Sequence, residues 1–168
     1  MLGVNLVFAG FALTLNGVSY FIEMDGKAKG IANLLVGIII AINAVFQTAQ
    51  ATNPMTFGFA AAMWLFALNY FVLAAHMLLG AANWKVFGMY ALFAAITSFV
   101  FAGESIYLGA PVAMIYMWLM WGVLWGQSAL ASLFGIKAID KISPHVLILN
   151  GIASTFVPGF LILMGIIL

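Results

Sequence analysis

Long apolar stretches alternate with short polar clusters along the whole chain. A helix needs roughly 20 predominantly apolar residues to cross a bilayer, and most of the stretches approach that length. They are continuously apolar, whereas the strands of a membrane β-barrel would alternate apolar and polar positions. Cutting the chain at its polar clusters predicts six membrane-spanning helices, at about residues 2–22, 31–48, 56–80, 86–101, 112–134 and 145–168.

Proline, glycine and asparagine mark several boundaries between these helices. The pair Asn53-Pro54 divides what would otherwise be one over-long apolar run, because the residue before a proline disfavours the helical conformation. Two further boundaries fall at Gly109 with Pro111 and at Ser143-Pro144. We therefore expect residues 1–168 to form one all-α domain, a bundle of six transmembrane helices.

The composition places nearly all of the chain in the bilayer. Of its 168 residues, 67% are hydrophobic and 5% are charged, and the mean hydropathy is +1.23. Soluble domains are about 25% charged, so this composition excludes a soluble enzyme, a nucleic-acid-binding protein and a disordered regulator. The absence of cysteine excludes disulfides, thiolate metal sites and a cysteine nucleophile. We expect no cofactor and no metal.

The lysines predict an orientation for the chain. All five lie between the first and second, third and fourth, or fifth and sixth spans, and the chain has no arginine. Positively charged loops stay on the cytoplasmic side of a membrane. Both termini are therefore expected outside, in a plasma membrane. The N-terminus does not resemble a cleavable signal, because no basic segment precedes the first apolar run.

The predicted spans contain no lysine and no acidic residue. Ion-coupled transporters usually place an ionisable side chain near the middle of the membrane, so the expected permeant is uncharged and moves down its gradient. Uncharged polar side chains do occur in most spans: Asn5, Asn16, Asn43, Gln47, Asn69, His76, Asn150 and Ser154. They either form hydrogen bonds between helices or line a pore, where an amide both donates to and accepts from a small polar solute.

Three tryptophans make the fifth span the most informative stretch. Trp118, Trp121 and Trp125 lie within about a 60° arc of a helix and cover roughly 10 Å of depth. An aromatic belt at the membrane surface would cluster at one level, whereas these residues run toward the middle of the span. They either pack against other helices or line a path. Gly122 and Gly126 form a GxxxG pair that allows another helix to approach closely.

Two other function classes fit parts of the sequence. The stretch Gly126-Gln127-Ser128-Ala129 loosely resembles the nucleophile motif of an intramembrane serine protease, with His145 on the last span as its base. That motif lacks its final glycine, and no oxyanion donors are marked. His76 and His145 are more simply explained as anchors at helix ends. The other alternative is a membrane assembly protein whose tryptophans face neighbouring helices and which transports nothing.

Several motifs, in order along the chain, resemble the AmiS/UreI family of urea and amide channels. The most specific is Trp118-Leu119-Met120-Trp121-Gly122-Val123-Leu124-Trp125. The others are Met1-Leu2-Gly3 with Gly10 and Asn16-Gly17, Asn33 with Gly37, Tyr90-Ala91-Leu92-Phe93-Ala94, and Asn150-Gly151 with Pro158. The resemblance covers essentially the whole chain, including the six-span layout with both ends outside.

The resemblance implies a fold and an activity. Each protomer would enclose its own pore, in a homohexameric ring whose centre is filled by lipid, and would passively conduct urea, short aliphatic amides and water. By the motif match, Trp118, Trp121, Leu124 and Trp125 would line the narrow part of the pore. Three further candidates for contact with the permeant are Asn16, Val72 and Asn150. Hydrolysis of the solute would belong to a separate enzyme.

The sequence departs from the family pattern in ways that bear on selectivity and gating. Asn150 stands where many members have a glutamate, and Val72 stands where many have an aromatic residue, so the polarity and width of the pore differ from theirs. Acid-gated members carry long outer loops rich in histidine, which titrates near neutral pH. The outer loops here, at about 49–55 and 102–111, are short and contain no histidine. We therefore expect no acid gating.

Overall fold

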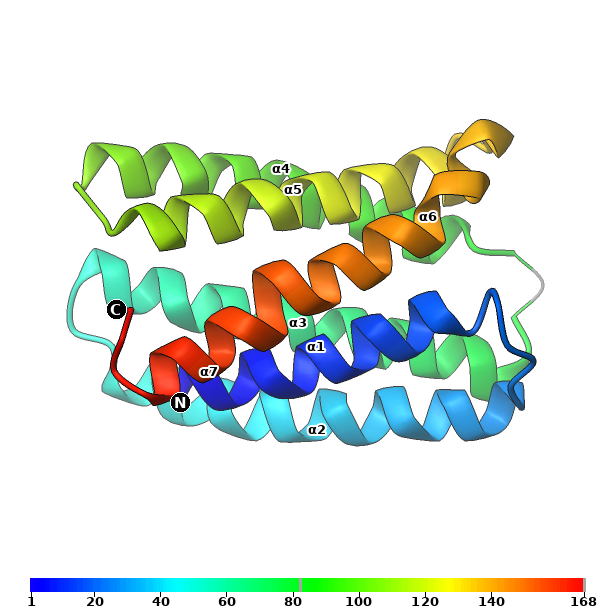
Figure 1. The fold of residues 1–168 in the computed structure, drawn as a ribbon, viewed down its shortest axis with the longest axis horizontal. Helices are drawn as coiled ribbons and strands as arrows, with labels where there is room; N and C mark the ends of the chain where they lie inside the picture. The colour runs from blue at the N-terminus through cyan, green and yellow to red at the C-terminus, as the bar shows by residue number, and fades with distance from the viewer. Residues whose placement is uncertain (82, 168) are drawn as a thin grey trace.

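The computed structural model describes residues 1–81 and 83–167, whose helices run roughly side by side (Figure 1). The helices are α1 (Leu2–Val18), α2 (Gly26–Gln50), α3 (Pro54–Leu79), α4 (Lys85–Tyr107), α5 (Val112–Ser132), α6 (Lys137–Leu149), the π-helical segment η1 (Asn150–Phe156) and α7 (Val157–Leu163). The last three follow one another without a break and form one rod. The prediction of an all-α fold is confirmed.

Four of the described helical segments are long and apolar enough to cross a membrane: α2, α3, α4 and the rod Lys137–Leu163. α1 is apolar but shorter, with 17 residues. α5 has 21 residues and is not among those four.

The helices pack as two hairpins and a crossing pair. α2 lies along α3, α4 lies along α5, and α1 lies against the rod formed by α6, η1 and α7 (Figure 1). The connections after α1, α3 and α5 meet at one end of the bundle. All five lysines lie in or beside these connections, so we call this the lysine end. Met1, α7 and the other two connections lie at the opposite end, here called the terminal end (Figure 1).

The predicted boundary at Asn53-Pro54 is confirmed by its capping geometry. The Asn53 side chain accepts a hydrogen bond from the backbone N–H of Thr56, and the Thr56 side chain accepts one from the backbone N–H of Asn53. Pro54 occupies the first helical position, where its missing N–H costs no helical hydrogen bond. Gly109 likewise forms part of a turn, with a φ of 66° that favours glycine.

Other helix ends differ from the prediction. α1 stops at Val18, four residues early, where the Ser19 hydroxyl donates to the carbonyl oxygen of Asn16. α4 extends to Tyr107, so Glu104 lies in its last turn and not in a loop. The boundary at Ser143-Pro144 is wrong, because the helix begins at Lys137 and continues through Pro144. A proline there removes one helical hydrogen bond, which the surrounding helix tolerates.

Three glycines place α1 in direct backbone contact with the rod. A Cβ atom built on Gly3, Gly10 or Gly17 would lie within 2.7–2.9 Å of the carbonyl oxygen of Gly159, Gly151 or Pro144, respectively. The three glycines are seven residues apart and therefore share one face of α1. The contact explains why a chain with this packing needs glycine at those positions.

Gly10→Ala is accordingly expected to destabilise the protein by about 1–3 kcal/mol, the usual cost of overpacking. Its new methyl group would lie 2.7 Å from the Gly151 oxygen and 2.8 Å from the Phe156 nitrogen. Thermal unfolding in detergent measures this loss of stability as a lower Tm. Size-exclusion chromatography reports how much folded protein remains at each temperature. Gly103→Ala is the matched control, because nothing lies within 4 Å of the added atom. Equal Tm values for the two variants would contradict the predicted backbone contact.

Candidate functional site

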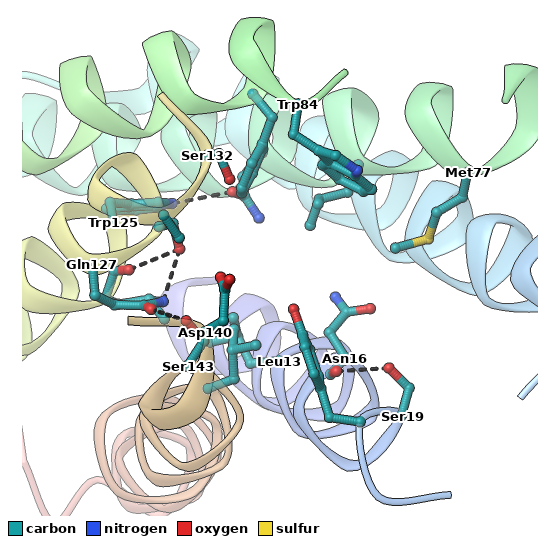
Figure 2. Close-up of a pocket in the computed structure, with 18 of the residues that line it drawn as sticks. Leu13, Asn16, Ser19, Met77, Trp84, Trp125, Gln127, Ser132, Asp140 and Ser143 are labelled. Carbon is teal, nitrogen blue, oxygen red and sulfur yellow. Dashed lines mark hydrogen bonds between the residues drawn. The ribbon is translucent and has the colours of Figure 1, made fainter. Parts of the chain in front are cut away.

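A cavity of about 590 Å³ opens at the lysine end of the bundle (Figure 2). Helices α1, α3, α5 and α6 contribute most of its wall. Its polar lining includes Asn16, Ser19, Tyr20, Lys29, Asn69, Gln127, Ser128, Ser132, Asp140 and Ser143. Its apolar lining includes Leu13, Leu73, Leu124 and Trp125. This volume is in the range of small-molecule sites, and the mixture of donors and acceptors suits an uncharged polar solute.

Polar side chains around the mouth of this cavity hold one another in place. Gln127 Nε2 donates to Ser128 Oγ over 2.9 Å, and the Ser143 hydroxyl donates to the Gln127 side-chain oxygen. On the facing wall, Asn16 and Asn33 exchange two amide hydrogen bonds of 2.8 and 3.0 Å, which join α1 to α2. The interhelical role that the sequence suggested for buried amides is therefore confirmed at Asn16.

Tyr20 and Asp140 lie at the cavity mouth. Desolvation by the surrounding protein raises the pKa of the Tyr20 phenol, and the Asp140 carboxylate raises it further. Both effects keep the phenol protonated, so Tyr20 presents a neutral donor to the cavity. The mouth consequently combines a lysine, a carboxylate and neutral polar groups.

Trp125 joins the inner end of the cavity to α3. Its indole Nε1 donates to Asn69 Oδ1 over 3.1 Å, and both residues are buried (Figure 2). This hydrogen bond satisfies the indole N–H at a depth where few other partners exist. The hydrogen bond thereby fixes two side chains of the cavity wall relative to each other.

Beyond Trp125, aromatic rings form a continuous series that we call the aromatic ladder: Trp125, Phe66, Trp121, Trp118 and Phe101. Successive ring centroids are 5.0, 5.0, 5.1 and 4.8 Å apart. The three tryptophans are at most 2% exposed. Their burial agrees with the sequence argument against an aromatic belt, because belt tryptophans face the membrane interface.

Smaller spaces lie along the ladder beyond the large cavity. Trp118 borders a space of about 20 Å³ at the terminal end, beside Glu104 and Met114. Trp121 borders a void of about 10 Å³, here called the Trp121 void. The ladder thus stands between the cavity at the lysine end and the space at the terminal end.

Five of the seven predicted site residues border one of these spaces, and two do not. Asn16, Leu124 and Trp125 line the large cavity, while Trp118 and Trp121 line the two smaller spaces. The structure places Val72 and Asn150 outside the linings of all three spaces. The Asn150 amide donates to the carbonyl oxygen of Val146 and accepts from Ser154, so its own helix uses its hydrogen-bonding groups.

Two important residues were not predicted to belong to the site. Phe66 contacts both Trp121 and Trp125. The chain has 15 phenylalanines, and nothing in the sequence distinguishes Phe66 from the others. Gln127 was assigned only to the protease-like motif.

The proposed protease dyad does not form among the described residues. The Ser128 hydroxyl donates to the carbonyl oxygen of Leu124 over 3.0 Å, and His145 is exposed, with its ring edge against Phe21. His76 is buried, lies between the carbonyl oxygens of Val72 and Asn83, and stacks on Trp84. Gly122 packs closely against the Phe99 ring of α4, while the nearest atom to a Cβ on Gly126 is the Ala95 Cβ at 3.9 Å, so a side chain and not a helix backbone fills the space at this pair.

Comparison with known proteins identifies relatives of the whole chain. The model of the AmiS/UreI family transporters matches residues 1–166. The chain is 27% identical to an acid-activated urea channel of Helicobacter pylori, over 96% of this chain and 97% of that protein. It is 26% identical to a Mycolicibacterium smegmatis protein named for the transport of amidate substrates, over 97% of this chain and 76% of that protein.

The fold has a solved counterpart as well. The crystal structure of the Helicobacter pylori urea channel superimposes with a TM-score of 0.85 and 26% identity, covering 100% of both chains. The relatives are channels and transporters with several apolar helices, which places this chain among multi-pass plasma-membrane proteins and not among enzymes. The chain belongs to the AmiS/UreI family of transporters.

Proposed function

We propose that the chain is a passive channel for urea and short aliphatic amides. The observation that carries this proposal is the aromatic ladder, which continues from the large cavity through Trp125, Trp121 and Trp118 toward the terminal end. The names of the relatives, a urea channel and an amidate transporter, point to the same solutes.

The ladder explains selectivity in physical terms. A planar amide slides between aromatic faces and exchanges its water for indole and amide hydrogen bonds. An ion has no groups there to replace its hydration shell and is rejected. Glu104 and Asp140 lie near helix ends, so the described part of the path holds no carboxylate at mid-membrane for ion coupling. The proposed pore-lining residues are Trp118, Trp121, Leu124, Trp125 and Asn16, which border the three spaces, and Val72 and Asn150, which do not border them.

The proposed topology has six spans in one domain, 1–168, with both termini outside. α1 is about 26 Å long at 1.5 Å per residue, close to the thickness of a hydrocarbon core of about 30 Å. The lysines gather at one end of the bundle, which supports a cytoplasmic position for that end. The large cavity then opens to the cytoplasm, and the short connections 51–53 and 108–111 face outward.

Single introduced cysteines test this orientation without background labelling, because the chain has no cysteine of its own. Thr52→Cys is expected to react with a membrane-impermeant maleimide on intact cells. Lys137→Cys is expected to react only after the membrane is permeabilised. Labelling of Lys137→Cys from outside, with Thr52→Cys protected, would reverse the proposed topology.

Assembly is proposed to be a homohexamer with one pore in each protomer. The cavity and the ladder lie within a single chain, so a protomer needs no partner to complete its path. Large apolar side chains cover the outside of the bundle, among them Phe11, Phe46, Phe93 and Leu119. They supply surface for lipid and for neighbouring protomers.

Stopped-flow light scattering from proteoliposomes tests the function and the absence of an acid gate. Urea and acetamide are expected to enter several times faster than into empty liposomes, and glycerol more slowly than either. The urea rate is expected to agree within twofold at external pH 7 and pH 5, because neither outer connection contains histidine. A sucrose gradient measures water in the same apparatus. A large increase in urea flux at pH 5 would show gating, and rates equal to empty liposomes would contradict the channel.

A further inference from the structure

The inner end of the large cavity has one polar side chain with an unused donor. Each of the four helices that form most of the wall begins or ends at the lysine end, so its lining residue farthest from that end lies deepest. These residues are Leu13 on α1, Asn69 on α3, Leu124 and Trp125 on α5, and Leu147 on α6. The Trp125 indole N–H is already donated to Asn69 Oδ1. Among the lining residues that the structure describes, Asn69 is therefore the polar group nearest the aromatic ladder.

Trp125 fixes which way the Asn69 amide points. An indole N–H can only donate, so the amide atom that it contacts over 3.1 Å is the oxygen, Oδ1 (Figure 2). The nitrogen, Nδ2, lies on the other branch of the amide. The contact removes the ambiguity between oxygen and nitrogen that an asparagine side chain otherwise has.

Asn69 Nδ2 is open to the cavity. The side-chain atoms that the described part of the chain encloses completely and leaves without a partner are Asn5 Nδ2 and Trp121 Nε1. Asn69 Nδ2 is not one of them, although it forms no hydrogen bond to a described residue. Because Asn69 is only 3% exposed and lines the cavity, the cavity is the space that this donor faces. A buried donor without a partner is costly, so a water or a solute in the cavity is needed to accept from it.

We propose that Asn69 Nδ2 donates to the oxygen of the amide solute at the entrance to the aromatic ladder and thereby selects solutes that carry a carbonyl oxygen. The proposal rests on the proposed channel function and names the residue that recognises the solute. Here the solute leaves the polar part of the cavity for a path lined by rings, and its carbonyl group loses water at a cost. A donor that is already oriented replaces one of the lost hydrogen bonds. Trp125 acts as a positioning residue, because it holds the amide with Nδ2 toward the cavity.

The first arm of the test compares acetamide with thioacetamide, in which sulfur, a weaker hydrogen-bond acceptor, replaces the oxygen. Stopped-flow light scattering from proteoliposomes gives both rates, each after subtraction of the rate of empty liposomes. Asn69→Leu is expected to lower the ratio of the acetamide rate to the thioacetamide rate about threefold to tenfold, the factor that corresponds to one hydrogen bond. Trp125→Phe is expected to lower the ratio less, because the released amide then presents its oxygen to the cavity part of the time.

Asn43→Leu is the matched control for the loss of an amide between helices. The Asn43 side chain donates to Asn5 over 2.7 Å and does not line the cavity. Its replacement removes an interhelical hydrogen bond, as Asn69→Leu does, but leaves the cavity wall unchanged. The acetamide to thioacetamide ratio is expected to stay within twofold of the wild type.

The second arm observes the donor directly and needs no transport. The protein is labelled with ¹⁵N on the side-chain amides of asparagine and placed in nanodiscs. The Asn69 signal is the one that Asn69→Asp removes, a substitution that keeps an acceptor for Trp125. This signal is expected to shift when acetamide is added and to shift less with thioacetamide at the same concentration. The Asn43 signal, identified with Asn43→Leu, is expected to move with neither solute.

The two arms separate failure of the donor from failure of the channel. Acetamide rates equal to those of empty liposomes contradict the channel, while the shift of the Asn69 signal still tests the donor. A conducting channel whose acetamide to thioacetamide ratio is unchanged in Asn69→Leu overturns the proposal, and so does an equal fall in Asn43→Leu. An Asn69 signal that responds to neither solute, or equally to both, also overturns it and leaves Asn69 as a structural partner of Trp125.

Discussion

Replacement of Trp121 by alanine is expected to raise glycerol flux about tenfold and to leave the assembled protein intact. Trp121 is the central ring of the aromatic ladder, between Phe66 at 5.0 Å and Trp118 at 5.1 Å. Removing the indole joins the Trp121 void to its neighbours and widens the narrowest part of the proposed path. A fall of about 1.4 kcal/mol in the barrier suffices for a tenfold increase.

Stopped-flow light scattering measures the glycerol and urea rates, and size-exclusion chromatography in detergent measures assembly. Trp64→Ala is the matched control, because Trp64 is half-buried on α3 and its indole donates to Thr48 away from the ladder. It is expected to leave both rates within twofold of the wild type. If Trp121→Ala breaks the oligomer and glycerol flux stays low, the tryptophans serve assembly and not passage.

Asn69→Leu is expected to lower urea flux about tenfold. The substitution removes the acceptor of the Trp125 indole N–H, a buried hydrogen bond of 3.1 Å. Leaving that donor unpaired costs about 1–3 kcal/mol. It also removes the amide that lines the inner end of the large cavity, where solute must exchange water for protein hydrogen bonds.

A double-mutant cycle separates these two effects. Trp125→Phe in the Asn69→Leu background removes the unpaired donor, so Tm is expected to recover part of its loss while urea flux stays low. Thr97→Val serves as control, because the Thr97 hydroxyl donates only to Phe93 of its own helix. Additive Tm losses for Asn69→Leu and Trp125→Phe would show that the hydrogen bond contributes little.

Local chemistry explains which features could be predicted from the sequence. The boundary at Asn53-Pro54 was predictable because capping depends on residues within one turn. Pro144 misled the prediction, since a proline stops some helices and only bends others, depending on what packs around it. The π-helical turns at Asn150–Phe156 have no local signal. They lie where Gly151 meets α1, a contact between residues far apart in the chain.

In the candidate site, too, features that depend on one helix could be predicted, and features that depend on contacts between helices could not. The tryptophan spacing on α5 predicted a buried stripe, because helical periodicity alone places Trp118, Trp121 and Trp125 on one face. Phe66 completes the ladder from α3, and only the packing of α3 against α5 reveals it. The pairing of Asn5 with Asn43 likewise depends on how α1 meets α2. Site residues that a second helix contributes can be identified only from the tertiary structure.

In the proposed channel, an uncharged amide passes through this protein without an energy source. Equilibrium exchange of radiolabelled urea tests it most directly, with equal urea and equal pH on both sides of a proteoliposome and no ion gradient. The proposed channel predicts exchange at least several times faster than in empty liposomes, and slower exchange for glycerol. Urea exchange at the rate of empty liposomes, in vesicles that contain correctly assembled protein, would contradict it.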